Sequence, residues 1–234
     1  MHETGKITRK AILLSYWVDE HEKFKSDLDF GLVKSFLKSA AGGCFRDEEI
    51  EEYASVFFTR KSLFELLDCY DYMFVYFSGH SLFENRQVQI PLKNSEVIAE
   101  SEFIRPNKKL WIFMDCCRTQ REPMNSPDFE LPRKEYLFPK SCPQRRENWV
   151  FKISQMEPFS LIYYVTKLGE FAFSNAIGGF GTQIFFTTLM EKLDSETTFD
   201  FGQLVREINQ SPIAIQESSY IPGGLDLKEF SSLF

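Results

Sequence analysis

Two short hydrophobic runs stand out in the pattern of apolar and polar residues along the chain. They extend from Tyr72 to Phe77 and from Leu110 to Met114, and each stops abruptly at polar residues. Both runs are continuous and rich in aromatic and β-branched residues, which is typical of strands that are covered on both faces in a parallel sheet. We therefore predict two buried strands with a crossover connection between them.

The rest of the chain alternates between strand-like and helix-like segments. The pattern predicts strands over 10–18 and 159–165, helices over 29–39, 59–69, 181–193 and 201–208, a short β segment over 88–92, a turn and helix over 95–104, and a loop with a closing strand over 219–234. The charged segment 47–52 is interpreted as a solvated helix face. This alternation predicts an α/β fold with a doubly wound, mostly parallel sheet and right-handed crossovers.

Composition and charge narrow the class of protein. The chain has 234 residues, 43% of them hydrophobic, which is enough for one core, so we predict a single domain over 1–234. A net charge of −7 without a basic stripe argues against nucleic-acid binding and is compatible with cationic peptide substrates. The five cysteines lack disulfide-framework or zinc spacing. The apolar run 11–18 is too short for a signal peptide or a membrane span, so we expect a cytoplasmic protein.

Candidate chemistry follows the two buried strands. His80 lies three residues after Phe77. Cys117 lies three residues after Met114. Because function in open α/β sheets collects beyond the carboxyl ends of the strands, neighbouring strands would bring this imidazole and this thiol together. The thiolate is the reactive form of cysteine, and a nearby imidazole can generate it. Cys116 would point to the packing side, since side chains alternate along a strand.

These strand ends resemble those of the caspase-like cysteine peptidases, the family of caspases and metacaspases. In that family one strand ends in Ser-Gly-His-Gly and a later one in Asp-x-Cys, and this chain has Ser78-Gly79-His80-Ser81 and Asp115-Cys116-Cys117. The resemblance covers nearly the whole chain. It implies a six-stranded caspase-like sheet with helices on both faces and a thiol protease. It also implies His80 and Cys117 as the catalytic pair.

The resemblance further indicates how an oxyanion and a substrate would bind. The oxyanion donors would be the backbone N–H groups of Ser81, which stands where the family has glycine, and of Cys117. The stretch 164–175 is similar to the caspase segment that pairs with an extended substrate by strand addition. Within it, the implied substrate-binding residues are Ala172, Phe173 and Ser174.

Two acidic residues bear on the side chain that precedes the scissile bond. Asp115 matches the acid with which metacaspases bind Arg or Lys, and Ser174 replaces the caspase arginine that binds a substrate aspartate. Both differences favour cleavage after Arg or Lys. Asp29 resembles the second metacaspase acid, but it also fits a helix N-cap. Asp115 likewise fits a role in fixing the strand end.

The segment 118–150 differs from its surroundings because it is rich in proline and basic residues and has no clear period, which predicts a long loop. The resemblance implies an intersubunit linker that is cut during activation, and the alternative is an unprocessed surface loop. If cleavage follows basic residues, the self-cleavage candidates are Arg133, Lys134, Lys140, Arg145 and Arg146.

Two functional hypotheses follow. The first is a metacaspase-like cysteine endopeptidase, a hydrolase acting on protein or peptide substrates and activated by self-cleavage or by a partner. The second is a catalytically inactive caspase-like scaffold or protein-binding module. We expect no metal or other cofactor and no membrane partner. Calcium is a family option for which the sequence has no compact acidic loop.

Overall fold

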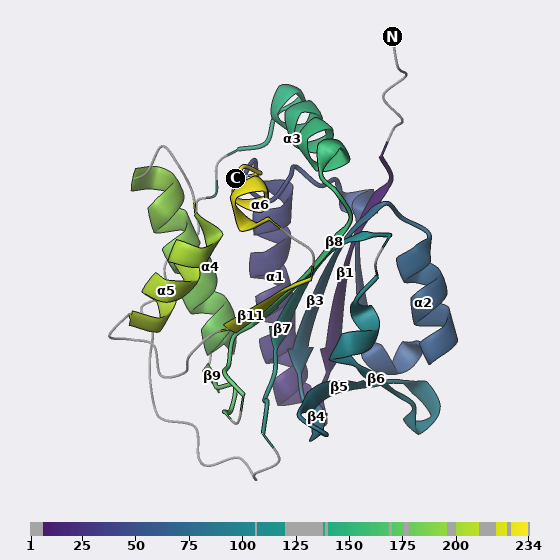
Figure 1. The fold of residues 1–234 in the computed structure, drawn as a ribbon. Helices are drawn as coiled ribbons and strands as arrows, with labels where there is room; N and C mark the ends of the chain where they lie inside the picture. The colour runs from purple at the N-terminus through teal and green to yellow at the C-terminus, as the bar shows by residue number, and fades with distance from the viewer. Residues whose placement is uncertain are drawn as a thin grey trace.

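A six-stranded sheet forms the centre of the protein, with strand order β11-β8-β7-β3-β1-β2 (Figure 1). The computed structural model describes residues 7–105, 107–119, 138, 140–168, 170–175, 178–195, 200–210, 219–223 and 226–233. The strands are β1 (Arg9–Tyr16), β2 (Ile50–Ala54), β3 (Tyr72–Gly79), β7 (Lys109–Asp115), β8 (Phe159–Tyr164) and β11 (Ser219–Gly223). All neighbouring pairs are parallel except β11 with β8. The predicted mostly parallel α/β sheet is confirmed.

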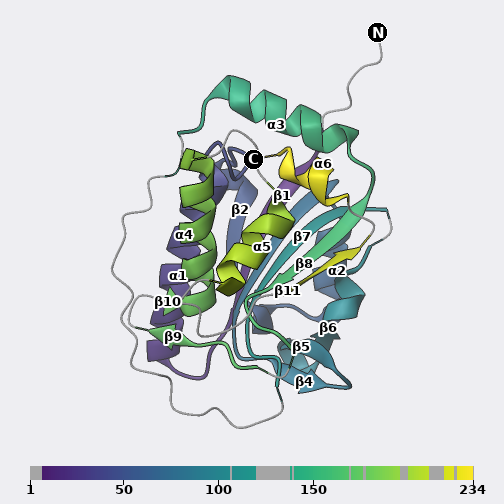
Figure 2. The ribbon, with the colours of Figure 1, turned by 60° about the vertical axis from the view of Figure 1, so that its left-hand side comes forward.

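One face of the sheet is covered by five helices: α1 (Glu20–Lys38), α3 (Pro143–Gln155), α4 (Phe180–Ser195), α5 (Phe201–Gln210) and α6 (Leu227–Ser231). Figure 2 shows α4 between α1 and α5 on this face. The core beneath these helices is rich in aromatic rings, including Trp111, Phe113 and Tyr163 from the sheet. Much of the chain's phenylalanine therefore serves to fill this layer.

The other face packs against α2 (Arg60–Asp68) and a small three-stranded antiparallel sheet. Its strands are β4 (Leu82–Glu84), β5 (Gln87–Pro91) and β6 (Val97–Ala99). In β3, Phe74 and Tyr76 face the first core while Val75 and Phe77 face the second, because successive side chains of a strand point to opposite faces. Helices therefore lie on both faces, as predicted.

The register of β3 and β7 aligns the two strand ends. Phe77 lies opposite Met114, and Ser78 lies opposite Asp115. The equal offsets of His80 and Cys117 from these strands therefore bring both residues to the same edge of the sheet.

Helix α1 is longer than predicted. It begins at Glu20, with Asp19 as the N-cap whose side chain accepts a hydrogen bond from the Glu22 N–H. The start expected at Asp29 was wrong because the first turns carry polar side chains that face solvent or a cavity, which hides their helical period. Asp29 is consequently not an N-cap but a buried residue inside the helix.

The charged segment 47–52 is not a helix face. It forms a short 3-10 turn (Asp47–Glu49) and the start of β2, which pairs in parallel with β1. Charged partners allow this edge strand to be so polar: Lys10 Nζ lies 2.5 Å from Glu51 Oε1, and Lys34 forms an ion pair with Glu52. The helix expected over 95–104 was also wrong. That segment contains β6 and a 3-10 turn (Glu100–Phe103).

The predicted loop 118–150 extends too far, because α3 already begins at Pro143, a residue suited to a first helical turn. Buried Trp149 and Ile153 anchor this helix. Arg145 and Arg146 therefore lie in α3, whereas Arg133 and Lys134 are outside the described residues. Lys140 is exposed.

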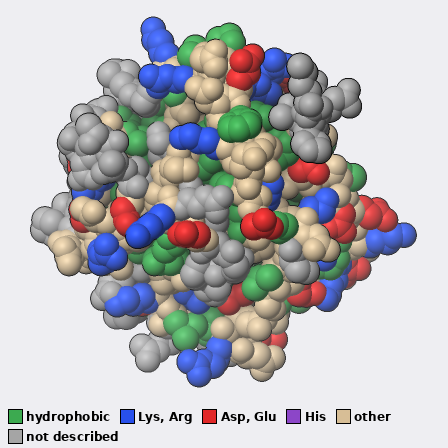
Figure 3. All heavy atoms as spheres, turned by 45° about the horizontal axis from the view of Figure 1, so that its top comes forward, with side chains coloured by type: hydrophobic (Ala, Val, Ile, Leu, Met, Phe, Trp, Pro, Cys, Tyr) green, Lys and Arg blue, Asp and Glu red, His purple; other side chains and the backbone are tan. Residues whose placement is uncertain are grey.

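The end of the molecule around α3, opposite the edge that carries His80 and Cys117, has a mixed surface. Figure 3 shows basic and acidic side chains interspersed on the described part of this face. Within the described ranges, no helix combines the length and apolar character needed to cross a membrane.

Candidate active site

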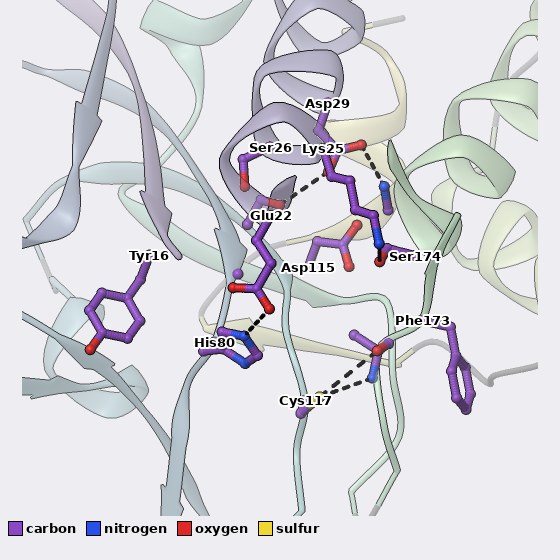
Figure 4. A pocket seen from close by; sticks show the side chains of 14 residues that line it. Tyr16, Glu22, Lys25, Ser26, Asp29, His80, Asp115, Cys117, Phe173 and Ser174 are labelled. Atoms are coloured by element: carbon purple, nitrogen blue, oxygen red, sulfur yellow. Dashed lines mark hydrogen bonds and ion pairs between the residues drawn. The ribbon is translucent and has the colours of Figure 1, made fainter. Parts of the chain in front are cut away.

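Beyond the carboxyl ends of β3 and β7 lies a cavity of about 120 Å³ (Figure 4). His80 and Cys117 both line it. The other sequence-predicted residues in its lining are Asp29, Asp115, Ala172, Phe173 and Ser174. The structure therefore collects the predicted catalytic and substrate-binding side chains in one place. Ser81 lies outside this lining but beside it in sequence.

The Cys117 thiol is half-buried and lies against Ala172, whose backbone N–H is 3.4 Å from Sγ. Burial raises the pKa of this thiol, the Ala172 N–H lowers it in part, and the charge of Asp115 raises it further. Within the described part of the chain, no hydrogen bond joins the thiol to His80. Burial therefore favours the thiol form of Cys117. Neighbouring Cys116 is only 1% exposed and packs in the core.

His80 is held by a carboxylate that the sequence analysis missed. Its Nε2 lies 2.8 Å from Glu22 Oε1, while Glu22 Oε2 accepts a hydrogen bond from the Val18 N–H at 2.9 Å. In Figure 4 the imidazole points towards Glu22, and Cys117 lies on the other side of the ring. If Nε2 carries the proton donated to Glu22, the lone pair of the neutral imidazole is on Nδ1.

The signal for Glu22 was present in the spacing of one helix face. Glu22, Lys25, Ser26 and Asp29 all line the cavity and follow the i, i+3, i+4, i+7 pattern of α1. Because the predicted helix began at Asp29, this pattern could not be recognised.

The turn after β3 is hydrogen-bonded to the end of β1 and to the residues that follow β7. Gly79 has φ +132°, and a Cβ there would lie 2.0 Å from the Tyr16 carbonyl oxygen, so glycine is required. The Tyr16 oxygen accepts a hydrogen bond from the His80 N–H at 3.0 Å. Ser81 has no positive φ, and its Oγ donates to the Cys117 carbonyl at 2.8 Å. Serine therefore fits where the resemblance implies glycine.

The backbone N–H groups of Ser81 and Cys117 donate no hydrogen bond to any other described residue. Buried or half-buried N–H groups normally have a partner. Both groups are therefore available as donors to a bound ligand.

Two carboxylates form the floor of the cavity. Asp29 is 2% exposed and Asp115 is 5% exposed. Asp29 accepts hydrogen bonds from the Gly179 N–H at 2.7 Å and from Ser78 Oγ at 3.1 Å. Asp115 Oδ2 accepts from Thr182 Oγ1 at 2.5 Å. Each acid thus has neutral donors that fix its position.

This pair has strongly perturbed protonation. Burial raises the pKa of Asp29 well above its usual range, and the charge of Asp115 raises it further. Burial also raises the pKa of Asp115 to about 6, although the hydrogen bonds from Thr182 oppose this. No Lys or Arg among the described residues forms an ion pair with either acid. Two buried carboxylates without a cation favour the uptake of one from outside.

Two glycines allow the chain to close over these acids. A Cβ on Gly179 would lie 2.1 Å from Asp115 Oδ2, and one on Gly178 would lie 2.2 Å from Asp29 Oδ1. Gly178 also has φ +121°. The antiparallel pairing of β10 (Gly178–Gly179) with β9 (Ser174–Asn175) therefore depends on residues without side chains.

The rim of the cavity carries a basic side chain. Lys25 Nζ donates to Ser174 Oγ at 3.1 Å, so Ser174 is occupied by a residue of α1. Phe173 and Ala172 form the adjoining wall beside Cys117. No described group of three or more His, Cys, Asp or Glu side chains has an arrangement that could hold a metal ion.

Comparisons with known proteins identify the fold. No protein-family model matches the sequence, and a search of curated proteins by sequence finds no match. Among solved structures, caspase-1 from Spodoptera frugiperda aligns with a TM-score of 0.52 and 14% identity over 92% of this chain and 86% of that one.

Two further structures align over similar lengths. The Drosophila initiator caspase Dronc has a TM-score of 0.55 and 10% identity over 97% of this chain and 85% of its own. Protein GSU0716 from Geobacter sulfurreducens has a TM-score of 0.55 and 13% identity over 94% of this chain and 97% of its own. Likenesses at this identity establish the fold and not the activity. The chain has a caspase-like fold.

Proposed function

We propose that the protein is a cysteine endopeptidase that hydrolyses peptide bonds after Arg or Lys. The observation that carries this proposal is the pair of buried acids, Asp29 and Asp115, on the floor of the cavity that also holds Cys117 and His80. A guanidinium or ammonium group entering the cavity would supply the missing positive charge through charge-assisted hydrogen bonds.

In the first half of the reaction, Cys117 Sγ attacks the backbone carbonyl carbon of the substrate's Arg or Lys residue, and the thiol proton passes to His80. The oxyanion accepts hydrogen bonds from the Ser81 and Cys117 N–H groups. The intermediate then breaks its C–N bond, and His80 returns the proton to the leaving amine. This leaves a thioester on Cys117.

In the second half, water attacks the thioester carbon while His80 accepts a proton from it. The C–S bond then breaks, and His80 returns the proton to the departing sulfur, which gives the carboxylic acid and the free thiol. Glu22 acts as a positioning residue, since it fixes the imidazole and stabilises its cationic form. Among the described residues, the thiol of Cys117 and the imidazole of His80 are not joined by a hydrogen bond. This is compatible with catalysis, because such contacts often tighten only when substrate binds.

Hydrolysis of fluorogenic peptides that end in Arg, Lys or Asp tests the proposal, with and without calcium. Wild type should cleave after Arg or Lys, and Cys117→Ala should abolish this activity. Cys116→Ala is the matched control, because it removes the neighbouring buried thiol and should retain activity if the variant folds. Cleavage after Asp alone would overturn the specificity. Inactivity towards all peptides would favour the alternative of a protein-binding module.

Self-cleavage follows from the same specificity. The candidates Arg145 and Arg146 lie in α3, and Arg146 also bonds to Glu49, which makes this helix a poor extended substrate. The proposed sites are therefore Arg133, Lys134 and Lys140. Intact-mass measurement of wild type beside Cys117→Ala tests this, since only wild type should yield fragments ending at one of these residues.

A further inference from the structure

A second, larger cavity of about 600 Å³ adjoins the acidic one. Tyr16 and His80 line both cavities, so the imidazole stands between them. Ser81 lines only the second cavity, and its hydroxyl is bonded to the Cys117 carbonyl. The second cavity therefore begins at the reacting groups, on the side of His80 away from the two acids.

This second cavity has an apolar wall that is open to solvent, and the rest of its lining includes the polar residues Lys93, Asn94, Ser95 and Glu96. Val56 is 39% exposed and Leu82 is 47% exposed, and they come from two different elements, the 3-10 turn Ser55–Phe57 and β4. Pro91 and Val97 extend the same wall from β5 and β6. Exposed apolar side chains that converge on a concave site are a usual feature of ligand-binding surfaces.

The chemistry proposed for the site determines which part of a substrate reaches this cavity. With a basic side chain in the acidic cavity and its carbonyl at Cys117, the leaving nitrogen must lie beside His80, which protonates it. The chain that follows the scissile bond therefore leaves on the far side of the imidazole. The second cavity occupies that side and is much larger than the acidic one, so it can accept a bulky side chain.

We infer that this cavity binds the substrate residue that follows the scissile bond and prefers a large apolar side chain such as Leu or Phe. The inference rests on the proposed peptidase function. It adds a second specificity site, with Val56 and Leu82 as its determinants. Because burial of a large apolar side chain is favourable but part of it remains solvated in this open cavity, discrimination of about tenfold is expected.

Internally quenched peptides test this. The peptides share one sequence through Arg and differ only in the next residue, which is Leu, Phe, Gly or Asp. Wild type should show kcat/KM values about tenfold higher for Leu and Phe than for Gly, and lower still for Asp. Val56→Ser and Leu82→Ser should each reduce the Leu-to-Gly ratio at least threefold. Ile104→Ser is the matched control, since Ile104 is 43% exposed and lines neither cavity.

The outcomes separate this inference from the function beneath it. Cleavage after Arg with equal rates for Leu and Gly would overturn the second specificity site and leave the peptidase intact. An equal change of the ratio in Ile104→Ser would also overturn it. Absence of cleavage of every peptide would remove both. If a variant fails to fold, as seen by circular dichroism, the wild-type panel alone still decides.

Discussion

The carboxylates near the two ends of the central strands differ in their burial and in what surrounds them: Glu49 is half-buried, whereas Asp29 and Asp115 are buried. Near the start of β1, Glu49 contacts two arginines, with Arg9 Nη2 at 3.1 Å and Arg146 Nη2 at 2.5 Å. At the end of β7, Asp29 and Asp115 receive only neutral donors among the described residues. The carboxylate near the start of β1 is therefore paired with cations of the protein, whereas the two carboxylates at the end of β7 are not.

The difference appears in the protonation of the acids. At Glu49 burial raises the pKa, but the hydrogen bonds from Arg146 and Arg9 outweigh it and lower the pKa to about 2. At Asp115 burial prevails and raises the pKa to about 6. An acid whose pKa is lowered by partners within the protein stabilises the fold at neutral pH, whereas an acid whose pKa is raised by burial destabilises it. Acids of the second kind are found more often at functional sites.

Substitution of the cavity acids should have the largest effect on activity. Asp115→Asn or Asp29→Asn removes a charge-assisted hydrogen bond worth about 1.5–3 kcal/mol, so kcat/KM for Arg peptides should fall roughly 10- to 150-fold. Glu49→Gln is the control for a half-buried acid outside the cavity and should leave kcat/KM within about twofold, a change of under 0.5 kcal/mol. Equal losses of kcat/KM in all three variants would contradict the distinction between the cavity acids and Glu49.

The same variants should move stability in opposite directions, as measured by denaturant unfolding at pH 7. Asp115→Asn should raise the free energy of unfolding by about 1–3 kcal/mol, because it removes a carboxylate that ionises less readily when folded. Glu49→Gln should lower it by about 3 kcal/mol, because two guanidinium groups lose their shared anion. A loss of stability in Asp115→Asn would contradict the assignment of that acid to binding.

The stability contributions of Asp115 and Glu49 should also depend on pH in opposite ways, because the pKa of one is raised and that of the other is lowered. The unfolded chain releases the Asp115 proton near the ordinary value of 3.8, while the folded protein keeps it to about 6, so this acid reduces stability as pH rises between them. Glu49 contributes fully above its ordinary value of 4.5, and that contribution is lost as pH falls towards 2. Unfolding curves of the two variants across pH 2–8 should therefore diverge from wild type in different windows.

The sequence predicted the carboxyl ends of β3 and β7 better than the region around Glu49. The continuous hydrophobic runs of β3 and β7 predicted the sheet. The equal offsets of His80 and Cys117 from these strands predicted that both residues lie at the same end of it. The surroundings of Glu49 were missed, because the segment 47–52 is so charged that its pattern resembles a helix face. Several of its partners are distant in sequence: Arg146 contacts Glu49, and Lys10 contacts Glu51. Such pairing depends on tertiary contacts that no local pattern records.

Parts of the candidate site were missed for a similar reason. Glu22 lies in helical turns whose polar residues face a cavity instead of a core, so hydrophobic periodicity could not define them. The close approach of Gly179 to the acid pair is a property of β10, β7 and α1 brought together by folding. The larger cavity likewise combines side chains from separate elements, each of which is unremarkable in sequence.

Glu22 is an intermediate case, because this acid lines the same cavity as Asp29 and Asp115 but has a partner within the protein, His80. Glu22→Gln keeps the shape but loses the charge that stabilises the His80 cation, so kcat should fall about tenfold with little change in KM, equal to about 1.4 kcal/mol of transition-state stabilisation. Glu22→Asp should retain more activity than Glu22→Gln, which a purely structural role would not produce. A loss expressed only in KM would contradict the role in orienting His80.

Lys25 tests how open the acidic edge is to an external cation. Its ammonium group lies on the rim of the acidic cavity, bonded to Ser174, and repels a basic side chain that enters. Lys25→Ala should therefore lower KM for Arg peptides about two- to threefold at low salt, since a partly solvated charge is worth about 0.5 kcal/mol, and the gain should shrink as salt screens it. Lys23→Ala is the control, because Lys23 pairs with Asp27 on the same helix and does not line the cavity. An unchanged KM in Lys25→Ala would contradict the repulsion. A raised KM, with Lys23→Ala equal to wild type, would mean that Lys25 helps to hold the substrate and that the cavity binds a ligand other than a cation.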